Sequence, residues 1–105
     1  MKYHIIRTDT ADKSIRSIIM YIAQAFGNDV ALRKLDEIQS RIMALSENPY
    51  LGEKLRYYVL RRQGYRALTL EKNLVFYKVD EEKKQVVVHA VVDQRQDYLN
   101  IIQGI

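Results

Sequence analysis

Arginine, lysine and tyrosine are the residues of this chain whose types could carry chemistry, and they concentrate in its second half. An arginine fork binds phosphate oxygens in pairs, and a tyrosine ring can stack on a base or transfer a proton. Together with lysine they could form a metal-free ribonuclease, in which cations stabilise the charge on the reacting phosphate. The alternative is that they cover a sheet with solvated charge and amphipathic rings. The candidates are Lys54, Arg56, Arg61, Arg62, Tyr65, Arg66, Tyr77, Arg95 and Tyr98.

The positive charge of the chain is unevenly distributed. The formal net charge is +4, and the segment from Lys54 to Arg66 holds five Arg and Lys residues without any Asp or Glu. A local positive field of this kind attracts polyanions, either nucleic acid or an acidic protein segment. A modest excess of charge is also common on ordinary solvated surfaces.

Other kinds of site have little support in the sequence. The chain has no Cys, and its two histidines, His4 and His89, lie in separate predicted strands without a second ligand nearby, so we interpret both as structural. The four glycines are isolated and form no phosphate-binding loop. We therefore expect no metal and no cofactor. The absence of Cys, of a signal-peptide pattern and of a long apolar run predicts an unprocessed cytoplasmic protein.

The first half of the chain has the pattern of a strand followed by two helices. Residues 3–7 predict a strand, residues 8–10 can cap a helix, and Gly27 ends it. Asn28 is predicted to cap the second helix, which ends at Asn48-Pro49. Spacings of three and four predict two apolar faces that pack into a long antiparallel hairpin. These faces comprise Ala11, Ile15, Ile18, Ile22 and Phe26, and Ala31, Leu35, Ile38, Ile42 and Leu45.

The second half changes to β-branched and aromatic residues and predicts a sheet. Strands are expected over 65–70, 74–79 and 86–92, with a short final helix within 96–105. Residues 57–62 are interpreted as an extended linker because of their charge. The whole order predicts an α+β fold over residues 1–105 as a single domain, in which the N-terminal strand joins an edge of a three-stranded antiparallel meander and the helical hairpin packs on that sheet.

Several motifs follow one another along the chain. After a helix that contains Tyr21-Ile22 come a "YR" strand, an "FY-x-VD" strand, an apolar strand and an "R-x-D-Y" ending. These motifs read Gly64-Tyr65-Arg66-Ala67-Leu68, Leu74-Val75-Phe76-Tyr77-Lys78-Val79-Asp80, Val86-Val87-Val88-His89-Ala90-Val91-Val92 and Arg95-Gln96-Asp97-Tyr98. In their order and spacing, nearly the whole chain resembles toxins of the RelE/ParE superfamily. The resemblance implies the toxin of a type II toxin–antitoxin (plasmid stabilisation) module, which arrests growth and is silenced by a cognate antitoxin protein. We expect the antitoxin to dock on the helical hairpin or to extend an edge of the sheet.

The superfamily divides into two activities, and the residues favour the ParE-like branch. RelE-like members cut messenger RNA on the ribosome, whereas ParE-like members inhibit DNA gyrase. An arginine found early in one RelE-like strand is replaced here by Asn73-Leu74, and a pair of lysines in the preceding strand is reduced to Arg66. If Gly64-Tyr65-Arg66 instead matches the "GYR" of RelE-like enzymes, Arg66 becomes the catalytic arginine.

Each branch implies its own set of site residues. A ribonuclease would use Arg66 and Arg95 on phosphate and Tyr98 in proton transfer. A gyrase inhibitor would need only a contact surface, comprising Lys54, Arg56, Arg61, Arg62, Arg66, Tyr77, Arg95 and Tyr98. The third alternative is a harmless relative that keeps the fold without the toxicity.

Overall fold

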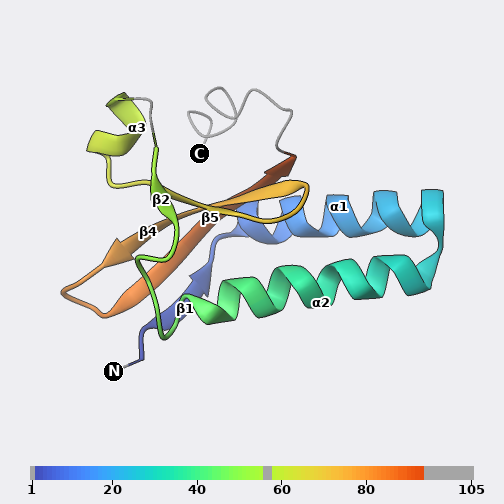
Figure 1. The fold of residues 1–105 in the computed structure, drawn as a ribbon, viewed down its shortest axis with the longest axis horizontal. Helices are drawn as coiled ribbons and strands as arrows, with labels where there is room; N and C mark the ends of the chain where they lie inside the picture. Colours follow the sequence, from blue (N-terminus) through green and yellow to red (C-terminus); the bar gives the residue numbers. More distant parts are fainter. Residues whose placement is uncertain (1, 56–57, 94–105) are drawn as a thin grey trace.

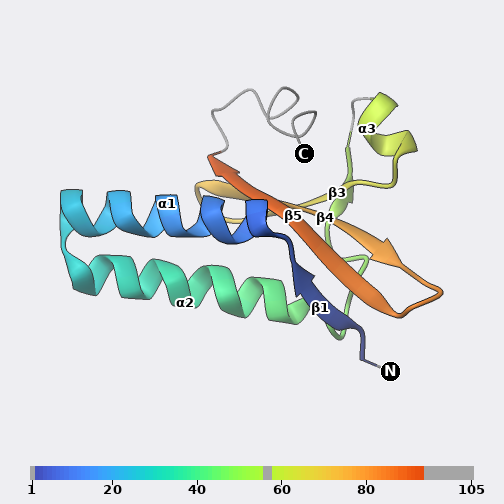
Figure 2. The same cartoon turned by 180° about the vertical axis from the view of Figure 1, so that it is seen from behind.

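The computed structural model describes residues 2–55 and 58–93, which form one sheet with a helical hairpin on one face and a short helix on the other (Figure 1). Figure 2 shows the same layers from behind. The elements in chain order are β1 (His4–Arg7), α1 (Asp9–Phe26), α2 (Asn28–Ala44), β2 (Glu53–Lys54), α3 (Tyr58–Arg62), β3 (Arg66–Thr69), β4 (Asn73–Asp80) and β5 (Gln85–Asp93).

The sheet has five strands in the order β1-β5-β4-β3-β2. The predicted meander of β3, β4 and β5 is confirmed, and β1 joins its edge by parallel pairing with β5, with Ile5 opposite Val86. The short strand β2, which the sequence did not predict, pairs antiparallel with β3 at the other edge. The predicted final helix within 96–105 lies outside the described residues.

The start of the hairpin is as predicted, but the link between its helices differs. Thr8 caps α1, since its Oγ1 accepts a hydrogen bond of 3.1 Å from the Ala11 N–H. Gly27 ends α1 with a φ of 95°, which L side chains rarely adopt. The prediction that Asn28 caps α2 is wrong: Gly27 itself holds the N-cap position and no side chain bonds there. The chain reverses within one residue, so Asn28 already belongs to the first turn of α2.

Apolar side chains cover both faces of the sheet, as the apolar run in β5 predicted. The hairpin face buries Ile15 and Ile38 against Val88, and the opposite face, called the outer face below, buries Phe76 and Ala90. Because β4 and β5 are neighbouring inner strands and both contribute to both clusters, they form the centre of the fold together. Among the described residues, no helix is long and apolar enough to cross a membrane.

The segment predicted as an extended linker, residues 57–62, contains the helix α3, so that interpretation is wrong. Its Leu60 is 1% exposed in the outer-face cluster, while Arg61 and Arg62 remain exposed. One inward leucine therefore anchors the helix, and the charges that suggested a linker lie in solvent. Gly64, with a φ of 89°, follows the helix, and its N–H donates to the Arg61 carbonyl at 3.0 Å.

Candidate functional site

Three of the predicted site residues lie in one row across the sheet. Lys54 on β2 is opposite Arg66 on β3, and Arg66 is opposite Tyr77 on β4. Residues paired across strands point to the same face, and Tyr77 belongs to the cluster on the hairpin face. The fold thus brings these three together, and the outer-face helix α3 carries Arg61 and Arg62 apart from them.

Arg66 uses its guanidinium on the protein's own backbone. Its Nε donates to the Gly52 carbonyl at 3.0 Å, and its Nη2 donates to the Tyr50 carbonyl at 3.3 Å. The guanidinium carbon also lies 5.1 Å from the centroid of the Tyr50 ring, which is cation–π distance. Arg66 therefore fixes the loop that precedes β2 and retains only part of its fork for an external ligand.

Tyr77 is fully buried beside this loop. Its Oη accepts a hydrogen bond of 2.8 Å from the Gly52 N–H. Burial raises the pKa of the Tyr77 phenol, and smaller opposing effects of the Gly52 N–H and of Arg66 lower it. The phenol is neutral at pH 7, and with an exposed fraction of 0% it presents no surface to another molecule.

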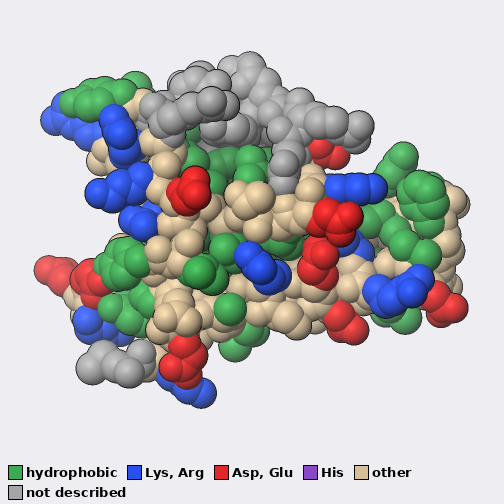
Figure 3. All heavy atoms as spheres, in the orientation of Figure 1, with side chains coloured by type: hydrophobic (Ala, Val, Ile, Leu, Met, Phe, Trp, Pro, Cys, Tyr) green, Lys and Arg blue, Asp and Glu red, His purple; other side chains and the backbone are tan. Residues whose placement is uncertain are grey.

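Helix α3 carries the most accessible cations of the predicted set. Arg61 and Arg62 on α3, and Lys54 on the hairpin face, are all exposed, and within the described residues none of them is paired with a carboxylate. Arg62 contacts the hydroxyl of the exposed Tyr58 at 3.5 Å. Figure 3 shows Lys and Arg side chains gathered over α3 and the end of the sheet beneath it. The positive segment of the sequence is thus a real surface feature.

A second group lies on the outer face between Tyr65, Lys78 and His89. Lys78 Nζ is 4.4 Å from the centroid of the Tyr65 ring, and the His89 ring meets Tyr65 edge-on with centroids 5.3 Å apart. Burial lowers the pKa of His89 and the charge of Lys78 lowers it further, so the imidazole is neutral at pH 7. The contact with Tyr65 gives His89 a packing partner, as a structural histidine requires. Lys78 was not among the predicted site residues.

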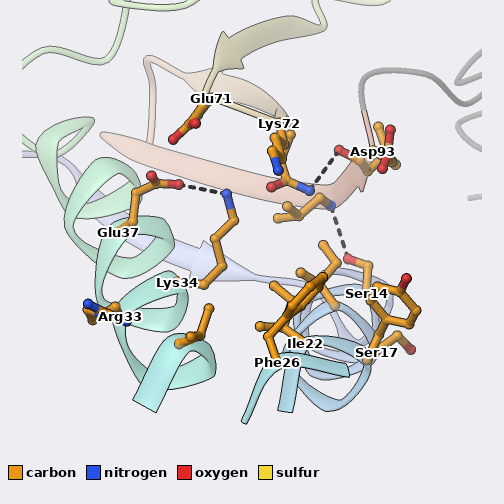
Figure 4. A pocket seen from close by; sticks show the side chains of 16 residues that line it. Ser14, Ser17, Ile22, Phe26, Arg33, Lys34, Glu37, Glu71, Lys72 and Asp93 are labelled. Atoms are coloured by element: carbon orange, nitrogen blue, oxygen red, sulfur yellow. Dashed lines mark hydrogen bonds and ion pairs between the residues drawn. The ribbon is translucent and has the colours of Figure 1, made fainter. Parts of the chain in front are cut away.

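A cleft of about 840 Å³ separates the hairpin from one end of the sheet, and the sequence analysis missed it (Figure 4). Its apolar wall comes from the outer half of the hairpin, where the side chains of Tyr21 and Phe26 are 67% and 65% exposed. Lys34, in an ion pair of 2.8 Å with Glu37, stands at its polar side. The signal in the sequence that could have indicated this cleft was the length of the apolar stripe of α1, because the stripe continues beyond the part of the helix that the sheet covers.

Arg56, Arg95 and Tyr98 lie outside the described residues. Within residues 2–55 and 58–93, no group of His, Asp and Glu side chains is arranged to hold a metal ion.

Solved bacterial toxins share this arrangement of sheet and hairpin. The chromosomal ParDE TA system from P. aeruginosa matches with a TM-score of 0.74 at 18% identity, over 88% of this chain and 96% of that chain. A mutant of E. coli toxin RelE in the free state matches with a TM-score of 0.66 at 20% identity, over 100% and 99% of the two chains. The toxin–antitoxin complex RelBE2 from Mycobacterium tuberculosis matches with a TM-score of 0.62 at 18% identity, over 90% and 100%. The chain thus has the fold of RelE/ParE-type toxins.

Comparison of the sequence with protein families identifies one family within this class of toxins. Residues 5–98 match the model of the ParE toxin of the type II toxin–antitoxin system parDE, and the chain belongs to this family. No curated protein matches the chain significantly. The predicted superfamily and fold are confirmed.

Proposed function

We propose that this ParE-family toxin arrests growth by binding and inhibiting DNA gyrase, without cutting a substrate. Family membership supports the role of toxin, and the state of Arg66 carries the choice of mechanism. The Arg66 guanidinium, the basic group best placed in the sequence to act on phosphate, is bound to two backbone carbonyls and lies against a tyrosine ring. Since both ParE-like and RelE-like targets are cytoplasmic, we place its action in the cytoplasm.

The second candidate is a RelE-like, ribosome-dependent endoribonuclease. The observation in its favour is the fold of E. coli RelE, which covers the chain from end to end. In that case Arg95 and Tyr98 would have to supply what the engaged Arg66 does not.

One experiment separates the two activities. Purified toxin is titrated into a DNA gyrase supercoiling assay, and transcripts are followed by primer extension after toxin is induced in cells. We expect inhibited supercoiling and intact transcripts. Normal supercoiling at saturating toxin, with transcripts cleaved at the onset of arrest, would overturn gyrase inhibition in favour of the nuclease. Growth unaffected by induction would instead support the harmless relative.

We also propose that a cognate antitoxin docks in the cleft between hairpin and sheet. The M. tuberculosis RelBE2 structure is a toxin–antitoxin complex of this fold. In the present chain the apolar wall of the cleft lies beside a polar rim, in which three cations and three carboxylates balance: Arg33, Lys34, Lys72, Glu37, Glu71 and Asp93. An amphipathic helix fits this combination, because its apolar face can cover the wall while its polar side chains of either sign meet the rim.

The docking site can be tested with two matched hairpin variants. Phe26→Glu puts a charge into the cleft, and Leu32→Glu puts the same charge at a side chain that is 58% exposed and outside the cleft lining. Each is co-expressed with the product of the neighbouring gene, the expected antitoxin, and purified through a tag on that partner. We expect Phe26→Glu alone to abolish co-purification. Equal retention of both variants would place the antitoxin elsewhere.

A further inference from the structure

The net positive charge of the protein comes entirely from one segment. Residues 54–66 carry five positive charges and no negative one, whereas the whole chain carries a net charge of +4. The rest of the chain is therefore slightly acidic. In the hairpin, Arg33 and Lys34 alternate with Asp36 and Glu37, so their fields largely cancel. A protein that is merely soluble and basic has no need of such segregation, and it concentrates attraction for a polyanion at one place.

The fold presents this segment as a protruding surface. Helix α3 stands off the outer face at the end of the sheet, above β2 (Figure 1). Arg61 and Arg62 are held in neighbouring positions on it because the buried Leu60 anchors the helix. The exposed hydroxyl of Tyr58 contacts Arg62 and can also donate to a phosphate oxygen. We call Tyr58, Arg61 and Arg62 the α3 surface.

We propose that the α3 surface binds the phosphate backbone of duplex DNA, a function additional to gyrase inhibition and independent of it. Cations that are exposed and unpaired with carboxylates in the described residues can neutralise phosphates directly and release counterions. Proteins that bind single strands also need aromatic rings on which bases stack. Tyr65, which lies under Lys78, is only 6% exposed, so within the described part of the α3 surface the ring of Tyr58 is the one available, and a single ring cannot stack successive bases. Backbone contact, without readout of bases, is the mode that these residues fit.

The test measures binding of a fluorescent DNA duplex of about 20 base pairs by anisotropy from roughly 50 to 200 mM salt, the range over which counterion release is strong. The toxin is used alone, without gyrase or antitoxin. The variant Arg61→Gln/Arg62→Gln is compared with Lys13→Gln/Arg16→Gln, which removes the same charge from exposed positions on α1. All four residues are exposed, so thermal unfolding checks that both variants keep the fold.

The two variants have different expected outcomes. Each phosphate contact contributes about 0.9 to the slope of log K against log salt, so the α3 variant should reduce the slope by about 1.8. From equal affinity at about 1 M salt, this change weakens binding about 60-fold at about 0.1 M salt. The α1 variant should change neither by more than about twofold. Equal weakening by both variants would show attraction to net charge alone and overturn the site. Tighter binding of single-stranded RNA of the same length, or displacement of DNA by an acidic peptide at equimolar charge, would assign the surface to another partner.

A supercoiling assay on the wild-type toxin separates this inference from the proposed function. If the wild-type toxin both inhibits gyrase and binds the duplex, both proposals stand. If the wild-type toxin inhibits gyrase but does not bind the duplex, only the DNA site fails. If the wild-type toxin binds the duplex but does not inhibit gyrase, gyrase inhibition fails and the DNA site stands.

Discussion

The contact between Gly52 and Tyr77 allows a quantitative test of how the loop before β2 is held. A Cβ at position 52 would lie 2.6 Å from the Tyr77 Oη and 2.8 Å from the Ala67 carbonyl oxygen. Both distances are shorter than real Cβ atoms show. Tyr77 has no room to move, since it is fully buried, and Ala67 is paired with Phe76 in the sheet. Gly52→Ala must therefore displace the loop itself.

The cost follows from two effects. Overpacking a rigid buried site costs about 1–3 kcal/mol. Displacing the loop also weakens two hydrogen bonds, from the Gly52 N–H to the Tyr77 Oη and from the Arg66 Nε to the Gly52 carbonyl. Each hydrogen bond lost costs about 1 kcal/mol. The φ of Gly52 lies outside the positive range, so no backbone strain is added. We expect Gly52→Ala to lower the free energy of unfolding by about 3 kcal/mol.

Urea unfolding followed by circular dichroism measures this loss. With a typical m-value of about 1.5 kcal/mol/M, the midpoint should fall by about 2 M. Tyr77→Phe removes the nearest clashing atom, so Gly52→Ala should cost about 1 kcal/mol less in that background. A midpoint shift of Gly52→Ala below about 0.3 M, or an additive double mutant, would show that the loop adapts freely and that Tyr77 does not hold it.

Three further predictions concern other contacts. His89→Gln should remove a pH dependence of stability. Burial and the charge of Lys78 lower the pKa of His89 below its ordinary 6.5, so the unfolded state binds more protons than the folded state. Urea midpoints should therefore show that wild-type stability falls as the pH drops from about 7 through the folded-state pKa. An identical slope in the variant would contradict this. Gly27→Ala should cost about 2 kcal/mol through its φ of 95° and ψ of 166° alone, since nothing lies within 4 Å of the added Cβ, and an unchanged melting temperature would refute it. Arg66→Gln should cost about 2 kcal/mol, and a neutral effect would show that its two carbonyl bonds are not needed.

Local patterns in the sequence predicted most of the fold. The stripe through Ala11 and Ile15 identified the buried face of α1, and the polar cluster of residues 8–10, of which Thr8 is the cap, identified its start, because both signals depend only on neighbouring residues. The helix α3 was missed because its charges outweighed Leu60 in the interpretation. Gly64, just after it, was the overlooked signal of a helix end.

The environment of the site residues could not be predicted in the same way. Arg66 bonds to carbonyls 14 and 16 positions earlier in the chain, and Tyr77 meets Gly52 across 25 positions. Residues so far apart in the sequence meet only after the sheet has formed. The type of each residue therefore showed which interactions its side chain can make, but not which partner it has in the fold. For the cleft, the sequence showed the apolar stripe of α1 and not where the sheet beneath it ends.

The pairing of the first strand with the last also determines when the toxin can become active during its own synthesis. Residues 4–7 pair with residues 85–88, so β1 emerges from the ribosome long before its partner exists. Until β5 is made, the apolar faces of the hairpin and of β4 lack the strand that they pack against and pair with. Long-range pairing of this kind forms late and slowly. A nascent or prematurely terminated chain thus lacks the completed sheet until residues 85–93 have been synthesised.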